Sequence, residues 1–319
     1  MAVVVPRYDT EVNEVGQPLT IVMPFYGRPD HFILAVQSIL AQTDPHWTLV
    51  IIDDMYPDKA PGKWASQLDD ERITYIRNTH NLMPSRNFNK GVDLAPTTFL
   101  TIVGCDDILL PGYVARVREL IAQFPDVDVI QPGVEVIDED GQVYLPLADR
   151  IKHMLRLRTT SSTQAFTGER LASSLLRGNW TYFPSLVWRR DTVAAIGFRV
   201  DLNIVQDLSM LTSISMGNGT LLIDREIVFQ YRRHSASLSA VTGPNGRKFR
   251  EERAFFLESS RLLKLQGWKR AARVSSRHAM SRMHAFTDLP RAILARNSEG
   301  ISTLTRHILG LPYRDFPQG

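Results

Sequence analysis

Two pairs of adjacent aspartates each stand shortly after an apolar run of the chain. Asp53 and Asp54 follow WTLVII, and Asp106 and Asp107 follow FLTIV and two small residues. If both runs are strands of one sheet, four carboxylates meet in one crevice, where like charges at ~4 Å repel by on the order of 1–4 kcal/mol. A divalent cation removes that repulsion, and carboxylates with phosphate oxygens are the usual ligands of Mg²⁺ and Mn²⁺. The pattern indicates a metal that bridges to a diphosphate; acidic residues that only begin loops or cap helices are the alternative.

The elements that must position these pairs alternate between strands and helices. Apolar runs predict strands at 19–23, 47–52, 73–76, 99–103, 127–136 and 221–231. Helical spacing predicts helices at 30–42, 63–68, 85–94, 112–123, 171–176, 191–196 and 205–216, while 145–167 reads as an irregular basic segment. This alternation is typical of an α/β fold with a mostly parallel, doubly wound sheet. Its ligands bind beyond the carboxyl ends of the strands, where both acidic pairs are expected.

The composition excludes several classes of protein. The chain has 319 residues, 44% hydrophobic and 22% charged, as in a globular protein with either one large domain or one domain and an appendage. Its single cysteine, Cys105, allows neither an internal disulfide nor a zinc site with two thiolates, and it suits a reducing compartment. No apolar run approaches the roughly 20 residues that span a bilayer. The motifs G-x-G-x-x-G, G-x-x-x-x-G-K-[ST], H-E-x-x-H and G-x-S-x-G do not occur, which argues against dinucleotide oxidoreductases, P-loop enzymes and common hydrolases.

The formal net charge of +3 hides an uneven distribution. Residues 244–319 hold 15 Lys and Arg against 6 Asp and Glu, so this tail carries +9 and the preceding chain −6. From residue 248 onward the pattern is helical, with breaks expected at Gly267, Pro290 and Gly300. A Ser- and Gly-rich stretch at 236–246 indicates a boundary between a main domain, 1–240, and a basic helical extension, 241–319.

The basic extension leaves two interpretations open. Its cations alternate with apolar residues, as in amphipathic helices that lie on an anionic membrane surface. The same pattern suits helices that pack against the main domain or a second subunit. Because the basic excess is confined to this tail, nucleic acid is not an expected partner. We expect a cytoplasmic protein that is soluble or peripheral on the inner face of the plasma membrane.

Seven segments of the chain, in order, resemble family 2 glycosyltransferases, which are inverting enzymes with a GT-A fold. The likeness covers roughly residues 19–240. The segments are Leu19–Pro29 (LTIVMPFYGRP), Ser38–Thr43 (SILAQT), Ile52–Asp54 (IDD), Asn81–Gly91 (NLMPSRNFNKG), Gly104–Pro111 (GCDDILLP), Gly197–Leu208 (GFRVDLNIVQDL) and Tyr231–Ser239 (YRRHSASLS). The resemblance implies that residues 1–240 form a GT-A nucleotide-sugar-binding catalytic domain.

The resemblance also implies an activity and the residues that carry it. The enzyme would be a metal-dependent, inverting hexosyl- or deoxyhexosyltransferase. It would move a sugar from a nucleoside-diphosphate sugar to a hydroxyl of a glycan or lipid-linked acceptor. Pro24, Phe25 and Tyr26 would line the pocket of the donor's base, and Asp54 would form a hydrogen bond to the base. Asn81 and Arg86 would lie near the nucleotide. Asp106 would contact the ribose or the sugar. Asp107 and His234 would hold Mg²⁺ or Mn²⁺, and Asp207 would be the general base.

Three positions depart from the family pattern. Gly27 replaces a common Asn, Gly104 replaces the first Asp of a longer motif, and Gln206 replaces the Glu that often precedes the base. Because an amide cannot take up the proton, Asp207 carries the role of base alone.

Structural alternatives stay open for several of these residues. Asp207 is also suited to capping a helix, Arg86 to lying in solvent, and His234 to a structural role. The aromatic side chains of Trp180, Tyr182 and Phe183 are as well suited to the core as to stacking on an acceptor sugar.

Two other functions compete with a glycosyltransferase. A sugar nucleotidyltransferase also uses such a sheet and metal-binding carboxylates, but it should open on a Gly-rich basic loop, which residues 23–28 (MPFYGR) do not form. A non-catalytic binding protein on the same fold would be indicated by loss of Asp107 or Asp207, and both are present.

Overall fold

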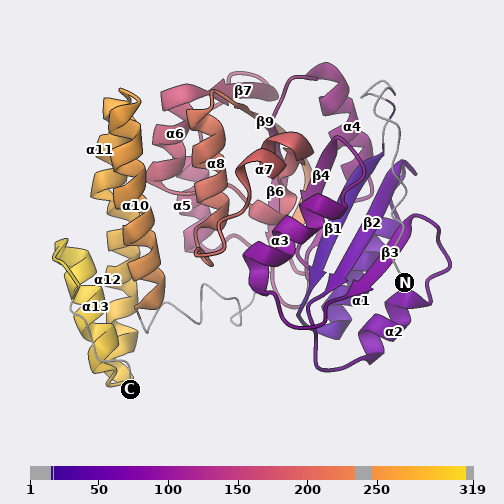
Figure 1. Cartoon of the computed structure of the whole chain (residues 1–319), viewed down its shortest axis with the longest axis horizontal. Coiled ribbons are helices and arrows are strands. Elements are labelled where there is room, and N and C mark those ends of the chain that lie inside the picture. Colours follow the sequence, from indigo (N-terminus) through magenta and orange to yellow (C-terminus); the bar gives the residue numbers. More distant parts are fainter. Residues whose placement is uncertain (1–15, 17, 234–245, 314–319) are drawn as a thin grey trace.

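The computed structural model describes residues 16, 18–233 and 246–313, and a nine-stranded sheet crosses it in the order β3-β2-β1-β4-β8-β6-β9-β5, with β7 against β9 (Figure 1). The strands are β1 (Leu19–Phe25), β2 (Trp47–Asp53), β3 (Ile73–Arg77), β4 (Phe99–Ile102), β5 (Ile108–Leu109), β6 (Val129–Ile137), β7 (Thr163–Thr167), β8 (Val187–Arg189) and β9 (Thr220–Arg232). Strands β1 to β4 are parallel, as is the β6–β9 pair, whereas β8 is antiparallel to both of its neighbours. Strands β5 and β7 are antiparallel to β9.

Helices cover both faces of this sheet. They are α1 (Pro29–Leu40), α2 (Ala60–Ser66), α3 (Met83–Leu94), α4 (Tyr113–Gln123), α5 (Leu147–Leu155), α6 (Gly168–Arg177), α7 (Arg190–Ile196), α8 (Gln206–Met216), α10 (Arg247–Leu265), α11 (Lys269–Arg277), α12 (Ala279–Leu294) and α13 (Ser298–Leu309). Side chains alternate along each strand, so Met23 of β1 joins the core under α1, α2 and α4, while Val22 joins the core under α3, α6 and α8. The doubly wound α/β fold predicted from the sequence is confirmed.

The segment 145–167 is not irregular as expected, because it contains helix α5 and strand β7. Its basic residues obscure a weak amphipathic pattern, in which Asp149 is buried and accepts a hydrogen bond of 2.8 Å from Tyr182 Oη. Strand β7 gains its structure from tertiary pairing, since Thr163 to Thr167 run antiparallel to β9.

Two of the three expected breaks in the C-terminal helices are wrong. Gly267 does separate α10 from α11, with a left-handed φ of 83° that suits glycine. Pro290, however, lies inside α12, where it is exposed and the hydrogen bond it cannot make lies on the solvent side. Gly300 lies in the first turn of α13, where its N–H donates to the capping Asn297 side chain at 2.9 Å.

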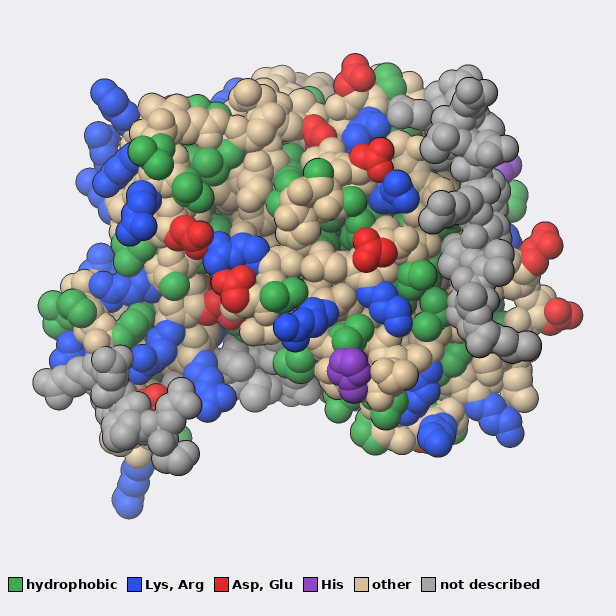
Figure 2. Space-filling view, in the orientation of Figure 1, with side chains coloured by type: hydrophobic (Ala, Val, Ile, Leu, Met, Phe, Trp, Pro, Cys, Tyr) green, Lys and Arg blue, Asp and Glu red, His purple; other side chains and the backbone are tan. Residues whose placement is uncertain are grey.

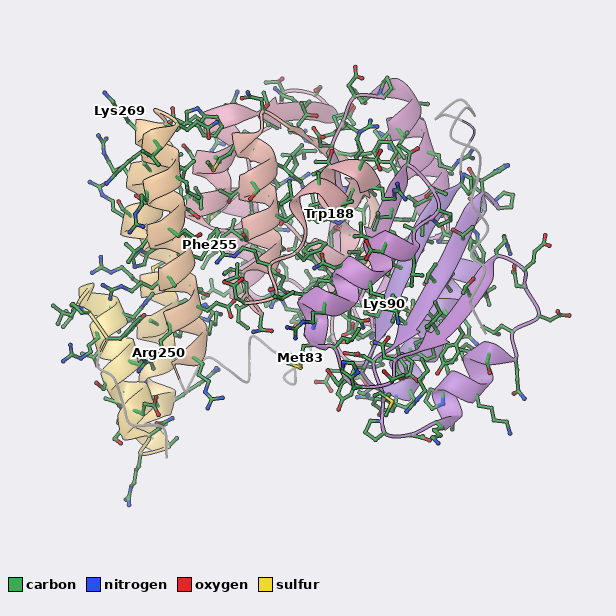
Figure 3. The ribbon with its side chains drawn as sticks, in the orientation of Figure 1. Met83, Lys90, Trp188, Arg250, Phe255 and Lys269 are labelled. Carbon is green, nitrogen blue, oxygen red and sulfur yellow. The ribbon has the colours of Figure 1, made fainter. Side chains whose placement is uncertain are left out.

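The C-terminal helices divide between two cores. Phe255, Phe256 and Leu263 of α10 and Ala271 of α11 belong to the core under α6 and α8, and Phe255 lies between α10 and α8 (Figure 3). Helices α12 and α13 form a separate small cluster with Phe249 of α10. All but the last residue of the expected boundary, 236–246, lies outside the described residues. Within the described ranges, no helix combines the length and the hydrophobicity that a membrane crossing requires.

Buried His307 predicts that these helices lose stability in acid. Its ring lies within 2.8 Å of Ser281 Oγ and 2.6 Å of Tyr313 Oη. Burial and neighbouring charges lower the pKa of His307 to about 3. The folded state therefore keeps this ring neutral, whereas the unfolded chain takes up a proton below about pH 6.5. The stabilisation is complete above pH 6.5 and is lost as the pH falls towards 3, by about 2 kcal/mol at pH 5.

Urea unfolding at pH 7.5 and at pH 5 measures this loss. The difference in free energy of unfolding between the two pH values should shrink in His307→Gln. It should not change in His80→Gln, since His80 is exposed. Equal pH dependence in the parent and in His307→Gln would contradict the prediction.

Candidate functional site

Asp107 is a buried carboxylate with an oxygen that nothing in the described structure satisfies. It follows β4, and its Oδ1 accepts a hydrogen bond of 2.9 Å from the backbone N–H of Arg232 at the end of β9. Its Oδ2 is buried and has no hydrogen-bond partner among the described residues. Burial and the adjacent Asp106 raise the pKa of Asp107 well above its usual range. The charge of Arg232 opposes this rise. It leaves Oδ2 without a partner among the described residues, and a bound cation would supply one.

The two carboxylates converge over Gly104. A Cβ atom at this position would collide with Asp107 Oδ2 and would lie 2.8 Å from Asp106 Oδ1. Only glycine leaves both oxygens in these positions, on the same side of the Gly104 backbone. Among the described residues no group of three or more acidic, His or Cys side chains could hold a metal. His234, the other expected ligand, lies outside them. Two carboxylates with substrate phosphates are a normal ligand set for Mg²⁺, so the residues present fit a divalent cation.

Gly104→Ala tests this arrangement. The added methyl group should displace one carboxylate at a cost of about 1–3 kcal/mol, which weakens cation binding by roughly 5- to 150-fold. Titration with Mn²⁺, followed by calorimetry, measures the change. Gly112→Ala is the control, because a Cβ at Gly112 meets nothing within 4 Å. Unchanged Mn²⁺ affinity in Gly104→Ala would show that this space is not the ion site.

The other acidic pair does not converge on the same space, which corrects the expectation of four facing carboxylates. Asp53 is fully buried and accepts hydrogen bonds from Tyr75 Oη at 2.6 Å, Arg77 Nη1 at 2.5 Å and the Tyr56 N–H at 2.8 Å. Arg77 is its neighbour in register on β3, so Asp53 is neutralised within the sheet. It is a structural residue.

Asp54 organises the segment that leads into α3. Its Oδ1 accepts from Asn78 Nδ2 and the Leu82 N–H, both at 2.7 Å, and its Oδ2 accepts from the Met83 N–H at 3.1 Å. Met83, at the first turn of α3 (Figure 3), has a φ of 65°, which is rare for a residue with a side chain. The hydrogen bonds that the Leu82 and Met83 N–H groups donate to Asp54 hold that strained backbone, so this loop is fixed before any ligand arrives.

The remaining residues expected to bind the donor surround this loop. Tyr26 is 56% exposed and contacts Tyr56 edge-on, so its ring is available to a ligand. The Phe25 ring is not, because it is fully buried and stacks on Phe32 in the core. Asn81 and Arg86 are exposed, and no hydrogen bond or ion pair joins the Arg86 side chain to another described residue.

Pro24 and Gly27 frame the same stretch of backbone. Pro24 is half-buried and pairs with Ile52 of β2. Gly27 has no room for the family's Asn, since a Cβ there would lie 2.8 Å from Cys105 Sγ.

Asp207 lies in the first turn of α8, but it does not cap the helix, because the N-cap position is Val205. Its Oδ2 accepts a hydrogen bond of 2.7 Å from Asn179 Nδ2, and its Oδ1 accepts one of 2.7 Å from the Leu208 N–H. Burial raises the pKa of the Asp207 carboxyl, and these two hydrogen bonds oppose that rise. A carboxylate with a raised pKa is a stronger base, which suits it to accept a proton.

A chain of hydrogen bonds fixes Asp207, and sequence reasoning missed it. Asn179 Oδ1 accepts from Thr181 Oγ1 at 2.7 Å, which orients the amide so that its Nδ2 faces Asp207. Lys152 Nζ donates to the Thr181 carbonyl at 2.8 Å. Burial and nearby Arg233 lower the pKa of Lys152 to about 8, while Asp149 and Asp207 oppose this. Polar residues between two predicted helices were the only signal in the sequence.

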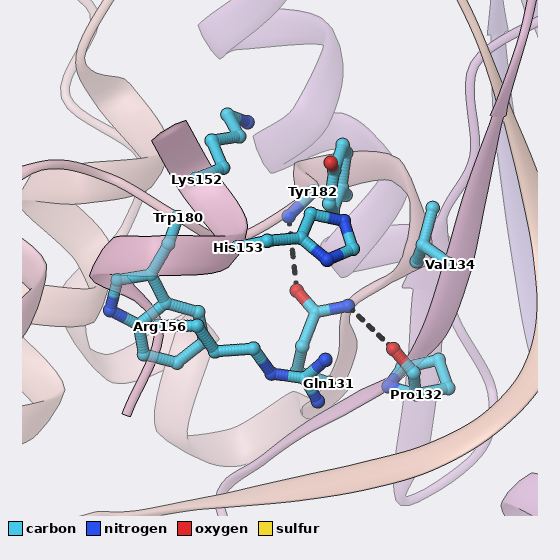
Figure 4. A pocket seen from close by; sticks show the side chains of 8 residues that line it. All are labelled: Gln131, Pro132, Val134, Lys152, His153, Arg156, Trp180 and Tyr182. Atoms are coloured by element: carbon cyan, nitrogen blue, oxygen red, sulfur yellow. Dashed lines mark hydrogen bonds between the residues drawn. The ribbon is translucent and has the colours of Figure 1, made fainter. Parts of the chain in front are cut away.

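A pocket lies beside this network, between α5 and β6 (Figure 4). Its lining residues are Gln131, Pro132, Val134, Lys152, His153, Arg156, Trp180 and Tyr182. Trp180 and Tyr182 are largely buried, and Phe183 packs against Phe88 and Phe198, so all three aromatic residues belong mainly to the core.

The sequence profile of glycosyl transferase family 2 matches residues 20–188, a little more than half of the chain. The chain belongs to glycosyltransferase family 2. An uncharacterized glycosyltransferase from Methanocaldococcus jannaschii is 29% identical over 136 residues, which are 41% of this chain and 47% of the relative. The uncharacterized glycosyltransferase YibD of Escherichia coli is 23% identical over 253 residues, 77% of this chain and 70% of the relative. The match to the first of these relatives spans less than half of that protein's length.

Two solved structures share the GT-A fold of this family 2 member. TarS of S. aureus, in complex with UDP-GlcNAc, superposes with a TM-score of 0.61 at 13% identity, covering 93% of each chain. A mannosyltransferase from Pyrobaculum calidifontis, in complex with GDP-Man and Mn²⁺, has a TM-score of 0.60 at 15% identity and covers 94% of this chain and 82% of its own. These likenesses establish the fold, and both neighbours hold a nucleotide-sugar on it.

Proposed function

We propose that this family 2 protein is a metal-dependent, inverting glycosyltransferase. It transfers a sugar from a nucleoside-diphosphate sugar to a hydroxyl of a glycan or lipid-linked acceptor. The observation that carries the proposal is the unsatisfied, buried Oδ2 of Asp107, which converges with Asp106 over Gly104. Without a cation, burial of this carboxylate destabilises the fold. A cation that arrives with the donor explains the arrangement.

The donor is proposed to lie along the ordered loop between β3 and α3, which Asp54 at the end of β2 holds in place. Its base would contact Tyr26, the Pro24 backbone and Asp54, whose carboxylate already holds the Leu82 and Met83 N–H groups. The exposed Arg86 and Asn81 would approach the diphosphate from the start of α3. Asp106 would contact the ribose or sugar, and Asp107 the cation. Bound Mg²⁺ or Mn²⁺ would act as a Lewis acid on the leaving diphosphate.

Asp207 is proposed as the general base. In an inverting transfer the acceptor hydroxyl loses its proton on the face of the sugar opposite the leaving group. Asp207 is oriented by Asn179 and has a raised pKa, both of which suit this step. A positioned base contributes about 10²–10⁴-fold to the rate.

A thermal-shift screen with UDP-, GDP- and dTDP-sugars, each with Mg²⁺ or Mn²⁺, tests the proposal. A true donor raises the unfolding temperature through mass action, and only in the presence of the metal. The free metal and the free nucleotide are the controls. A sugar nucleotidyltransferase would instead respond to a nucleoside triphosphate with a sugar phosphate. No shift with any nucleotide-sugar would count against a glycosyltransferase.

Asn179→Ala should move the pH dependence of transfer. The Asn179 amide donates to Asp207 and so favours its ionised form; without it the pKa of Asp207 rises further. Since the base must be ionised, the acid limb of the kcat profile should shift upward by about one pH unit. Asn203→Ala is the matched control, because that side chain has no hydrogen bond to any described residue. If the acid limb does not shift in Asn179→Ala, Asn179 does not control the pKa of the base.

A further inference from the structure

Six exposed cations gather at one edge of the molecule, on the last turns of α10 and along α11. We call them the basic edge; they are Arg261, Lys264, Lys269, Arg270, Arg273 and Arg277. Figure 2 shows Lys and Arg side chains lining the left edge, over α10 and α11, and Figure 3 places Lys269 at its upper end. None of the six side chains has an ion pair or hydrogen bond to another residue that the structure describes.

The acidic groups near the basic edge are used elsewhere. No Asp or Glu occurs from residue 259 to residue 287, a stretch that holds seven Lys and Arg. Glu258 forms an ion pair of 2.6 Å with Arg199. Glu169 of α6 accepts hydrogen bonds from the backbone N–H groups of Arg270 and Ala271, and so caps the start of α11. The positive charge of the edge is therefore not neutralised within the described structure.

Large apolar side chains are exposed on α10, between these cations in the sequence, and on α12. Leu262 and Leu265 lie between Arg261 and Lys269, and Leu265 is 82% exposed. On α12, the apolar stripe consists of Met283, Phe286, Pro290 and Ile293, whose spacing puts them on one face. The three large side chains of this stripe are about half exposed or more, and Phe286 is 64% exposed.

We propose that the basic edge and the apolar stripe dock this protein on an anionic lipid bilayer. A bilayer offers both complements at once, since its headgroups attract the cations and its interior accepts the apolar side chains. A second copy of the chain would bring two uncompensated positive edges together, which is unfavourable. Nucleic acid would match the cations but would leave the aliphatic side chains in water. The proposal does not depend on the chemistry at Asp107 and Asp207.

Vesicle co-sedimentation of the full chain tests the proposal. We expect binding to vesicles of phosphatidylcholine with phosphatidylglycerol, little binding to phosphatidylcholine alone, and weaker binding at high salt. Each cation near such a surface contributes about 1 kcal/mol, so Lys264→Gln with Lys269→Gln should weaken binding roughly 30-fold. The matched control is Lys59→Gln with Lys63→Gln, two exposed lysines at α2, which should bind like the parent.

The apolar contribution has its own variant and control. Phe286→Ser should weaken binding even at high salt, whereas Leu34→Ser, which alters an exposed leucine on α1, should not. No binding to anionic vesicles, or equal losses in the two lysine pairs, would overturn the proposal. So would a dimer that Phe286→Ser dissociates, since the stripe would then be an interface between copies. Donor-induced thermal shifts should be unchanged in all of these variants, which keeps this test separate from that of the proposed activity.

Discussion

Asp107→Ala should reduce sugar transfer by about 10³-fold or more, because in the proposed mechanism Asp107 would hold the cation that neutralises the charge of the leaving diphosphate. The same change should not weaken the fold when metal is absent. The parent buries a carboxylate whose Oδ2 has no partner among the described residues. Removing it relieves a desolvation cost, which offsets the loss of the hydrogen bond from the Arg232 N–H to Oδ1. In a chelator the variant should therefore unfold at the parent's temperature or above it.

Three measurements separate this outcome from general damage. We would compare Asp107→Ala with Asp126→Ala in three respects. These are the rate of sugar transfer, the unfolding temperature in EDTA, and the thermal shift on adding Mn²⁺ with donor. Asp126 is exposed, and its carboxylate has no hydrogen bond to the described residues, so its variant should behave as the parent does. Parent-like transfer in Asp107→Ala would remove Asp107 from the metal site. Loss of transfer together with a large fall in unfolding temperature would show that its role is structural.

Asp207→Asn should lower kcat by about 10²–10⁴-fold and leave donor binding intact. The substitution keeps the size of the side chain and an oxygen that can accept from the Leu208 N–H, and it loses the hydrogen bond from Asn179 Nδ2. It removes the only property that the proposed mechanism needs, which is the ability to take up the acceptor's proton. KM for the donor and the donor-induced thermal shift should therefore stay near the parent's values.

The control for Asp207→Asn is Asp191→Asn. Asp191 also lies in the first turn of a helix, α7, but is exposed and pairs with Arg190. If the acidic residue served only the helix dipole, both variants would lose similar stability and neither would lose transfer. Transfer by Asp207→Asn within a few-fold of the parent would refute the assignment of the base.

The strands that position the site were predictable because each buried strand is a run of consecutive apolar residues. WTLVII predicted β2 to within one residue, and the acidic pair after β4 pointed to Asp107. The role of Asp53 was not predictable, since its neutralisation depends on Arg77, which only strand register brings beside it. The same holds for Asn179, which reaches Asp207 through a loop whose path is set by tertiary packing.

The C-terminal part shows a second kind of limit. Pro290 and Gly300 are poor helix formers, and local propensity predicted breaks at both. The structure continues through Pro290 because Ala285 and Ala292, on either side, are buried against α13 and α10, and that packing outweighs local preference. Helix α5 was missed for the opposite reason, since its basic residues hide the few side chains that face inward.

The sharing of one hydrophobic core between α6, α8, α10 and α11 has a consequence for synthesis of the chain. When residue 240 leaves the ribosome, every strand of the sheet has been made, yet the outer faces of α6 and α8 still await Phe255, Phe256 and Ala271. Those faces stay open to water, or to chaperones, until about 30 further residues have emerged, at roughly 5–20 residues per second. The packing of the helical layer that contains α6 and α8 is therefore completed late. Premature termination near residue 240 should yield an aggregation-prone product.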